Sequence, residues 1–107
     1  MASGFDKLEQ GQNAKVQHDS EMQFRIEARR NKLLGLWAAE CMGIEGEAAD
    51  AYAIDVVKED IKEPGHQDVV DKIKSDFAAK GVDIDEDTIC RKLAHYEAAA
   101  VEQMQAE

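Results

Sequence analysis

The sequence predicts an all-α protein: a four-helix bundle preceded by a mobile N-terminal arm. Three observations support this prediction. Apolar residues recur at helical spacing over most of the chain, strand-like alternation is absent, and Pro64 is the only proline among 107 residues. A chain of this length is sufficient for one domain with a modest core. We therefore expect an arm at residues 1–18 and one helical domain at residues 19–107.

The first helix of the domain is expected at about residues 20–42. Ser20 and Gln23 have the spacing of a capping box, in which each side chain pairs with the backbone N–H of the other residue. Gly43 suits the position just after a helix, where the backbone is often left-handed. The last two turns are apolar almost all round, so we expect other helices to enclose them.

Three more helices are expected at about residues 47–62, 66–80 and 86–105, each with an apolar stripe at helical spacing. Pro64 and Gly65 end the second helix, and Gly81 ends the third. Asp85 is expected to be the N-cap of the fourth. The residues at the centres of the stripes are predicted to be buried, namely Leu33, Trp37, Val56, Ile73, Phe77 and Leu93.

The arm has too little apolar surface to build a core. Between residues 5 and 18 its sizeable apolar residues are Phe5, Leu8 and Val16, and Gly11 and Asn13 interrupt the pattern. Ordering a backbone costs about 1 to 2 kcal/mol per residue, which these few side chains do not offset. We expect the arm to become helical only against a partner.

The charge of the chain argues against two classes of partner. With 23 acidic and 13 basic residues the formal charge is −10, which repels nucleic acid and anionic membrane surfaces. The N-terminus lacks the basic and apolar regions of a signal peptide, and the apolar runs are too short to span a bilayer. We expect a cytoplasmic protein with no nucleic acid partner and no direct membrane insertion.

No pattern of residues indicates catalysis, a metal or a cofactor. A phosphate-binding glycine loop, zinc-finger cysteine spacing and hydrolase motifs do not occur. His18, His66 and His95 lie in three separate elements, so no metal site is expected. Cys41 and Cys90 are expected to be small reduced hydrophobic residues. The chain is therefore not expected to be an enzyme.

A cluster of cations, Arg25, Arg29, Arg30 and Lys32, stands close to the single tryptophan. Arg25 and Arg29 are i and i+4, so they share a helix face on which a phosphate or carboxylate could be held. Two interpretations remain open. The cations pair with acidic helices of the same chain, or they bind an anion, as in a small nucleotide-responsive domain with weak nucleotide binding.

The segment HDSEMQFRIEARRNKLLGLWAAECMG, residues 18–43, closely resembles the signature of the ATPase inhibitor subunit zeta family. This family belongs to the F-type ATP synthases of alphaproteobacteria. The resemblance continues through GEAADAYA, EPGHQDV, AAKGVDI and the C-terminal RKLAHYEAAAVEQMQAE, and so covers essentially the whole chain. It implies a four-helix fold and a regulator that blocks ATP hydrolysis by inserting its N-terminal segment between catalytic and rotor subunits of the synthase head.

The resemblance also implies which residues contact the synthase. Expected partner-binding residues in the arm are Phe5, Asp6, Leu8, Glu9, Ala14, Lys15, Val16 and His18. The arm departs from the family pattern where Gly11 replaces alanine and where Gln12 and Val16 replace phenylalanines. A glycine within a helix costs about 1 kcal/mol, and loss of a buried aromatic removes anchoring energy. These changes predict an inhibitor that is weakened or lost. The resemblance further implies a location peripheral to the inner membrane, through the ATP synthase.

Overall fold

The computed structural model describes residues 2–62 and 66–106, with the backbone alone for residues 2–20, 61 and 62. The predicted breaker Pro64–Gly65 lies outside the described residues. The described residues form four helices and no strand, namely α1 (Ala2–Cys41), α2 (Glu47–Lys62), α3 (His66–Lys80) and α4 (Glu86–Ala106). The predicted fold class is confirmed. No helix within the described ranges has the length and apolar character needed to cross a bilayer.

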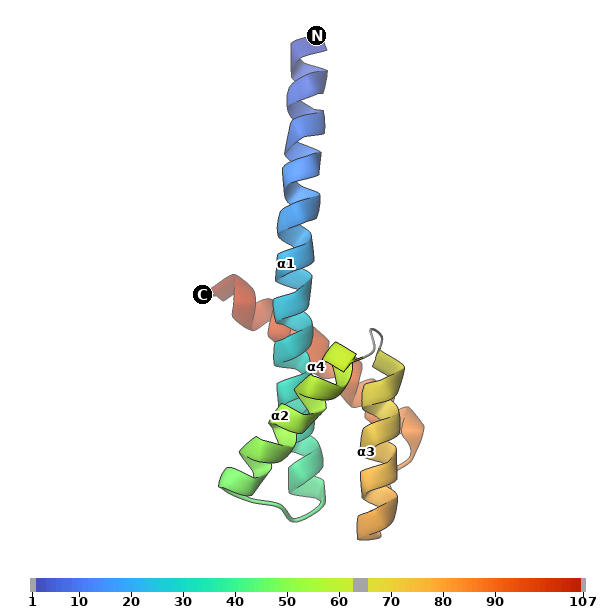
Figure 1. Cartoon of the computed structure of the whole chain (residues 1–107). Helices are drawn as coiled ribbons and strands as arrows, with labels where there is room; N and C mark the ends of the chain where they lie inside the picture. The colour runs from blue at the N-terminus through green and yellow to red at the C-terminus, as the bar shows by residue number, and fades with distance from the viewer. Residues whose placement is uncertain (1, 63–65, 107) are drawn as a thin grey trace.

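The first helix begins much earlier than Ser20. Helix α1 starts at Ala2 and runs unbroken to Cys41, so the predicted capping box at Ser20 lies inside a continuous helix. The N-terminal half of α1 projects far beyond the other three helices (Figure 1), and the molecule is 63 Å long but only 24 Å and 22 Å across. The segment predicted as an arm is this projecting part of α1, and it continues the first helix of the domain without a break.

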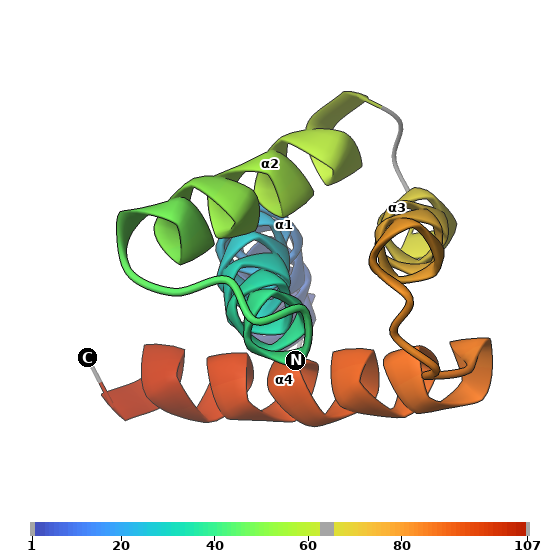
Figure 2. The ribbon, with the colours of Figure 1, turned by 90° about the horizontal axis from the view of Figure 1, so that it is seen from below.

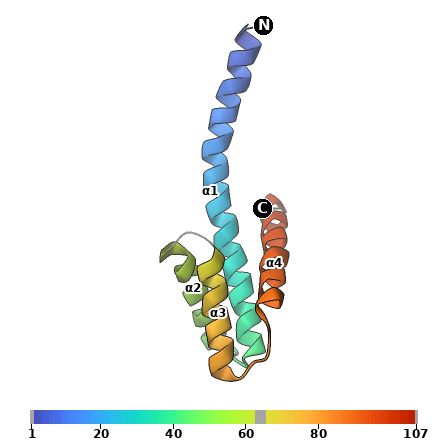
Figure 3. The same ribbon diagram turned by 90° about the vertical axis from the view of Figure 1, so that its right-hand side faces the viewer.

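The other three helices surround the C-terminal half of α1. Figure 2 shows α2 and α4 on opposite sides of α1, with α3 beside them and closing a third side. In the side view of Figure 3, α2, α3 and α4 all lie around the lower part of α1, and its N-terminal part extends alone. The domain therefore holds one end of a long helix and presents the other.

The helix ends within the domain follow the predicted signals. Gly43 and Gly81 have φ angles of 74° and 72°, which residues with side chains rarely adopt. Beyond each glycine the next N–H turns back to a helix carbonyl, from Ile44 to Ala39 and from Val82 to Phe77, both at 2.8 Å. At the start of α4, the Thr88 N–H donates to Asp85 Oδ1 at 2.9 Å, which confirms the predicted N-cap.

The core differs from the prediction in the register of α1. Val56, Ile73, Phe77 and Leu93 are buried as expected. Leu33 and Trp37 were also predicted to be buried, but both are only partly buried, and the fully buried leucine is Leu34.

The buried row of α1 explains this difference. It is Ile26, Arg30, Leu34 and Ala38, spaced by four residues, and Ala39 beside it is also fully buried. The small residues let the neighbouring helices approach closely, which leaves the large side chains at the margins. Trp37 packs edge-on against Phe77 from such a margin, with ring centroids 5.7 Å apart.

Candidate partner-binding site

The expected arm contacts all fall on the projecting part of α1. Phe5, Asp6, Leu8, Glu9, Ala14, Lys15, Val16 and His18 lie between Ala2 and Ser20, where no other helix runs alongside (Figure 1). Positions 5, 8, 12 and 16 are separated by three and four residues, so on one continuous helix they share a face. Gln12 interrupts this otherwise apolar row. The projecting helix thus offers a short amphipathic face with one polar residue in its middle.

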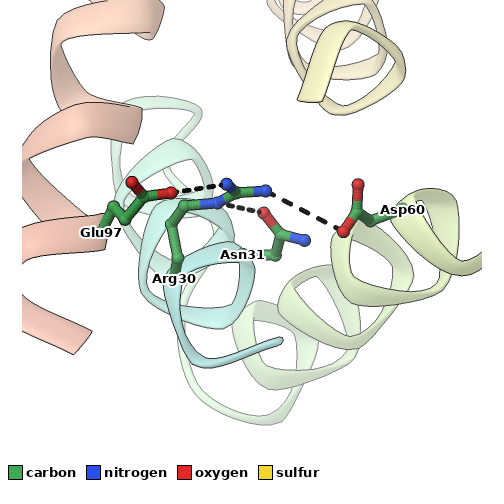
Figure 4. A network of polar contacts seen from close by, with 4 residues as sticks. All are labelled: Arg30, Asn31, Asp60 and Glu97. Atoms are coloured by element: carbon green, nitrogen blue, oxygen red, sulfur yellow. Dashed lines mark hydrogen bonds and ion pairs between the residues drawn. The ribbon is translucent and has the colours of Figure 1, made fainter. Parts of the chain in front are cut away.

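The helix that carries this face is anchored by a buried polar network. Arg30 and Asn31 are the buried polar residues among the described side chains, with exposed fractions of 3 % and 0 %. Figure 4 shows the Arg30 guanidinium between Glu97 of α4 and Asp60 of α2. Arg30 Nη1 donates to Glu97 Oε1 at 3.0 Å, and Arg30 Nη2 lies 3.9 Å from Asp60 Oδ2. Arg30 Nε donates to Asn31 Oδ1, also at 3.0 Å.

This network ties three helices together at the base of the arm. Arginine suits the task because its planar guanidinium carries several donors at once: here Nη1 donates to Glu97 of α4, and Nη2, without a hydrogen-bond acceptor, lies within ion-pair distance of Asp60 of α2. For Arg30, internal pairing with acidic helices of the same chain is therefore what the structure shows. Arg30 lies four residues from both Ile26 and Leu34, in the buried row, but the sequence alone does not show which of the possible rows is buried.

The remaining cations of the cluster lie at the surface. Arg25 and Lys32 are exposed and Arg29 is half-buried. All three line a hollow of about 490 Å³, whose apolar lining comes from Phe24, Ala28, Val57 and Met104. The hollow is thus shared by α1, α2 and the C-terminal end of α4. Anion binding by these three cations stays a prediction, whereas the guanidinium of Arg30 is already directed at carboxylates.

A second hollow of similar volume adjoins the first. It is lined by Asp50, Ile54 and Lys58 of α2, and it shares Lys32 and Val57 with the first hollow. We call the two hollows together the α1–α2 furrow. Phe24 and Ile54, its largest exposed apolar residues, keep 60 % and 50 % of their surfaces accessible. Neither residue was singled out from the sequence. Phe24 does not belong to the four-residue spacing of the buried row of α1, and an aromatic residue outside such a row is a sign of an exposed one.

On the far side of α2, a second polar cluster joins α2 to α3. The Tyr52 hydroxyl donates to Asp76 Oδ2 at 2.7 Å, and Lys72 Nζ contacts the same oxygen at 3.2 Å. Burial and the hydrogen bond to Asp76 together hold the pKa of Tyr52 well above its ordinary value. This tyrosine remains protonated at neutral pH and acts as a hydrogen-bond donor between the two helices.

The other titratable side chains that the structure describes include two cysteines and two histidines. Burial raises the pKa of the Cys41 thiol and that of the Cys90 thiol, which disfavours the reactive thiolate. His66 and His95 are exposed and lie on different helices. Among the side chains that the structure describes, no three His, Cys, Asp or Glu residues are grouped in a way that could hold a metal ion.

One of the comparisons with known proteins identifies a family. A family model described as ATPase inhibitor subunit zeta matches residues 1–103, which includes both the projecting part of α1 and the domain. A protein whose structure was determined in solution by NMR superposes with a TM-score of 0.71 at 45 % sequence identity. That alignment covers 79 % of this chain and 96 % of the other. No curated protein sequence gives a significant match.

Proposed function

The chain belongs to the ATPase inhibitor subunit zeta family, and from this premise we propose that it inhibits ATP hydrolysis by an F-type ATP synthase. The observation that supports this most is the continuity of the family match through residues 1–103, across arm and domain alike. An inhibitor subunit acts by binding, and no catalytic group is required of it. The partners in this proposal are catalytic and rotor subunits of the synthase head.

The proposed mechanism is a wedge. The arm enters the interface between catalytic and rotor subunits as an amphipathic helix, using the face that carries Phe5, Leu8 and Val16. A rotary enzyme must change conformation at this interface in every cycle. An inserted helix that binds one state more tightly than the next stabilises that state and stops rotation. The degree of inhibition is then set by the difference in affinity between the two states.

The domain contributes rigidity to this mechanism. The C-terminal half of α1 is held between α2 and α4 (Figure 2), and the Arg30 network fixes it to both. When the arm is helical at its binding site, α1 runs unbroken into the domain, so a domain docked on the outside of the head would hold the bound arm in a defined direction. Localisation follows from the same proposal: the protein is cytoplasmic and peripheral to the inner membrane through the synthase.

Deletion of residues 1–19 tests the proposal. In an ATP hydrolysis assay of the cognate synthase, the full chain should inhibit and the truncated chain should not. Circular dichroism of the truncated chain should show that the four-helix domain still melts cooperatively. Equal inhibition by both chains would assign the activity to the domain and overturn the wedge.

A second candidate function is a nucleotide-responsive domain, favoured by one observation. Arg25, Arg29 and Lys32 line one hollow together with Phe24, so cations of the kind that hold phosphates lie beside an aromatic ring. This candidate predicts saturable chemical-shift changes at those four residues when ATP is added to the labelled protein. Arg30 takes no part in it, because its guanidinium is buried and paired.

A further inference from the structure

The α1–α2 furrow has a charge opposite to that of the protein. The chain carries a formal charge of −10, yet the described residues that line the first hollow include the cations Arg25 and Lys32, beside the half-buried Arg29, and no carboxylate. The second hollow adds Lys58 and one acid, Asp50. Two further acids, Glu27 and Asp60, line only a small recess of about 20 Å³ between the same helices. A basic surface persists on an acidic protein, which favours a partner of negative charge.

The floor of the furrow is apolar. Val57 contributes to both hollows, and Ala28 and Met104 line the first. Phe24 stands 60 % exposed on α1 and Ile54 50 % exposed on α2. Single exposed apolar residues are common on proteins, but two large ones that line one continuous furrow with an apolar floor are typical of an interaction surface. A free anion would leave this apolar surface in water, and a partner with an apolar face would cover it.

We propose that the α1–α2 furrow is a docking site for an acidic amphipathic helix of a partner protein. The apolar stripe of such a helix would cover Phe24, Val57 and Ile54, and acidic residues at its flanks would meet Arg25, Lys32 and Lys58. Phe24 to Lys32 span about 12 Å along α1 at 1.5 Å per residue, which matches two turns of a partner helix. The site needs no residue of the projecting arm.

This inference depends on the proposed function in one respect only, the assembly that carries the acidic helix. If that assembly is the ATP synthase, the furrow is a second attachment point that begins directly after the arm. Inhibitor and enzyme would then be joined at two linked sites, and the effective concentration of the arm at its own site would be raised. Docking in the furrow itself can be measured without the synthase.

The test uses a synthetic amphipathic helix as a probe. The ¹⁵N-labelled full chain is titrated with an 18-residue peptide that has a leucine stripe flanked by glutamates, and with a matched peptide in which lysines replace the glutamates. The acidic peptide should give saturable shifts at residues 24–32, 54–58 and 104, and its affinity should fall as salt is added. The basic peptide should give none.

Substitutions at exposed residues separate the contribution of charge to peptide binding from that of apolar contact. Lys32→Glu combined with Lys58→Glu should weaken binding of the acidic peptide by about tenfold or more, and Phe24→Ser by about tenfold. Lys80→Glu is the control, because it makes the charge change of one of these lysine substitutions at an exposed residue at the end of α3, outside the furrow. It should leave the affinity unchanged. The melting temperatures of all these variants should match that of the parent.

Several outcomes would overturn the proposal. One is the absence of saturable shifts with the acidic peptide at millimolar concentration, and another is equal binding of the basic peptide. Shifts of the furrow residues with ATP but not with the peptide would assign the furrow to a nucleotide. Sedimentation equilibrium that shows a dimer broken by Phe24→Ser would assign it to a second copy of this chain. None of these results depends on the hydrolysis assay. The docking site can therefore be rejected without rejecting inhibition by the arm, and the reverse also holds.

Discussion

The Cα atom of Ala53 lies in the space that a side chain at Gly35 would need. A Cβ atom built on Gly35 falls 2.7 Å from the Ala53 Cα and 3.2 Å from both the Ala53 Cβ and the Val56 Cγ2. Backbone atoms, unlike the end of a flexible side chain, yield only if a helix moves. Gly35 therefore permits the close contact between α1 and α2 on which the floor of the furrow and the position of the arm depend.

Gly35→Ala should destabilise the domain. Alanine adds about 1 kcal/mol of helix propensity, but overpacking at a tight helix contact costs about 1 to 3 kcal/mol and moves α2 away from α1. We expect a lower midpoint of urea denaturation. Gly11→Ala is the control, because residue 11 belongs to the N-terminal half of α1 (Ala2–Cys41), the half that projects beyond the other helices (Figure 1), and it should leave the midpoint unchanged. A midpoint raised by Gly35→Ala would contradict the tight contact.

Removing the carboxylates of the Arg30 network should destabilise the protein more than removing the guanidinium. Arg30 is 3 % exposed, whereas the side chains of Asp60 and Glu97 are 16 % and 45 % exposed, so the carboxylates can be rehydrated and the guanidinium cannot. The double variant Asp60→Asn, Glu97→Gln leaves a buried cation without counterions. Its free energy of unfolding should fall by about 3 kcal/mol or more. Arg30→Met leaves two partly hydrated carboxylates and an apolar stem, and should lose less.

Chemical denaturation of the two proteins measures this difference. Lys74→Met provides a control, since Lys74 forms an ion pair with Glu86 at 2.9 Å on an exposed surface. Its midpoint should stay at the parent value. If Arg30→Met proves more damaging than the double variant, packing of the arginine stem and not burial of its charge is the main contribution of the network.

Tyr52 should make the stability of the protein fall at alkaline pH. Burial and the hydrogen bond to Asp76 raise the pKa of Tyr52 in the folded state, so folding favours the protonated phenol. Its contribution is therefore fully present below the ordinary tyrosine pKa of about 10, and is lost progressively as pH rises above that value. Between about pH 9 and 11 the parent should lose more of its melting temperature than Tyr52→Phe does. Parallel curves for the two proteins would show that Tyr52 ionises without penalty.

The helices that the sequence located best are those with strong local signals. Helices α2 and α3 begin and end at the predicted residues, because they are bounded by glycine, proline or a capping side chain. For α1 the local signal is weaker: the predicted start is a capping box at Ser20, and in the structure the helix extends beyond it to Ala2. No proline precedes Ser20, and Gly11 and Asn13 disfavour a helix without breaking it, so the capping box alone does not fix where α1 begins.

The register of α1 and its site could not be read from periodicity. Leucine, alanine or tryptophan occupies nearly every position from Leu33 to Ala39, so a stripe through Leu33 and Trp37 is as regular as one through Leu34 and Ala38. The choice depends on which face other helices can approach, and that is set by Gly35 and its contact with Ala53. The same choice turns Arg30 inward and leaves the other cations of the cluster to line the furrow.

The arm offers the most direct test of the proposed inhibitor, by repair of its interrupted face. Gly11→Ala adds about 1 kcal/mol of helix propensity in the bound arm, and Gln12→Phe adds an apolar anchor, between Leu8 and Val16, worth about 2 kcal/mol. Together they should lower the half-inhibitory concentration in an ATP hydrolysis assay by about a hundredfold. The melting temperature of the domain should barely change, because neither residue is in it. Gly11→Ala with Gln12→Ser, which improves the helix without the anchor, should give no more than a small part of this gain. Inhibition no stronger than that of the parent would mean that the arm does not dock through its apolar face.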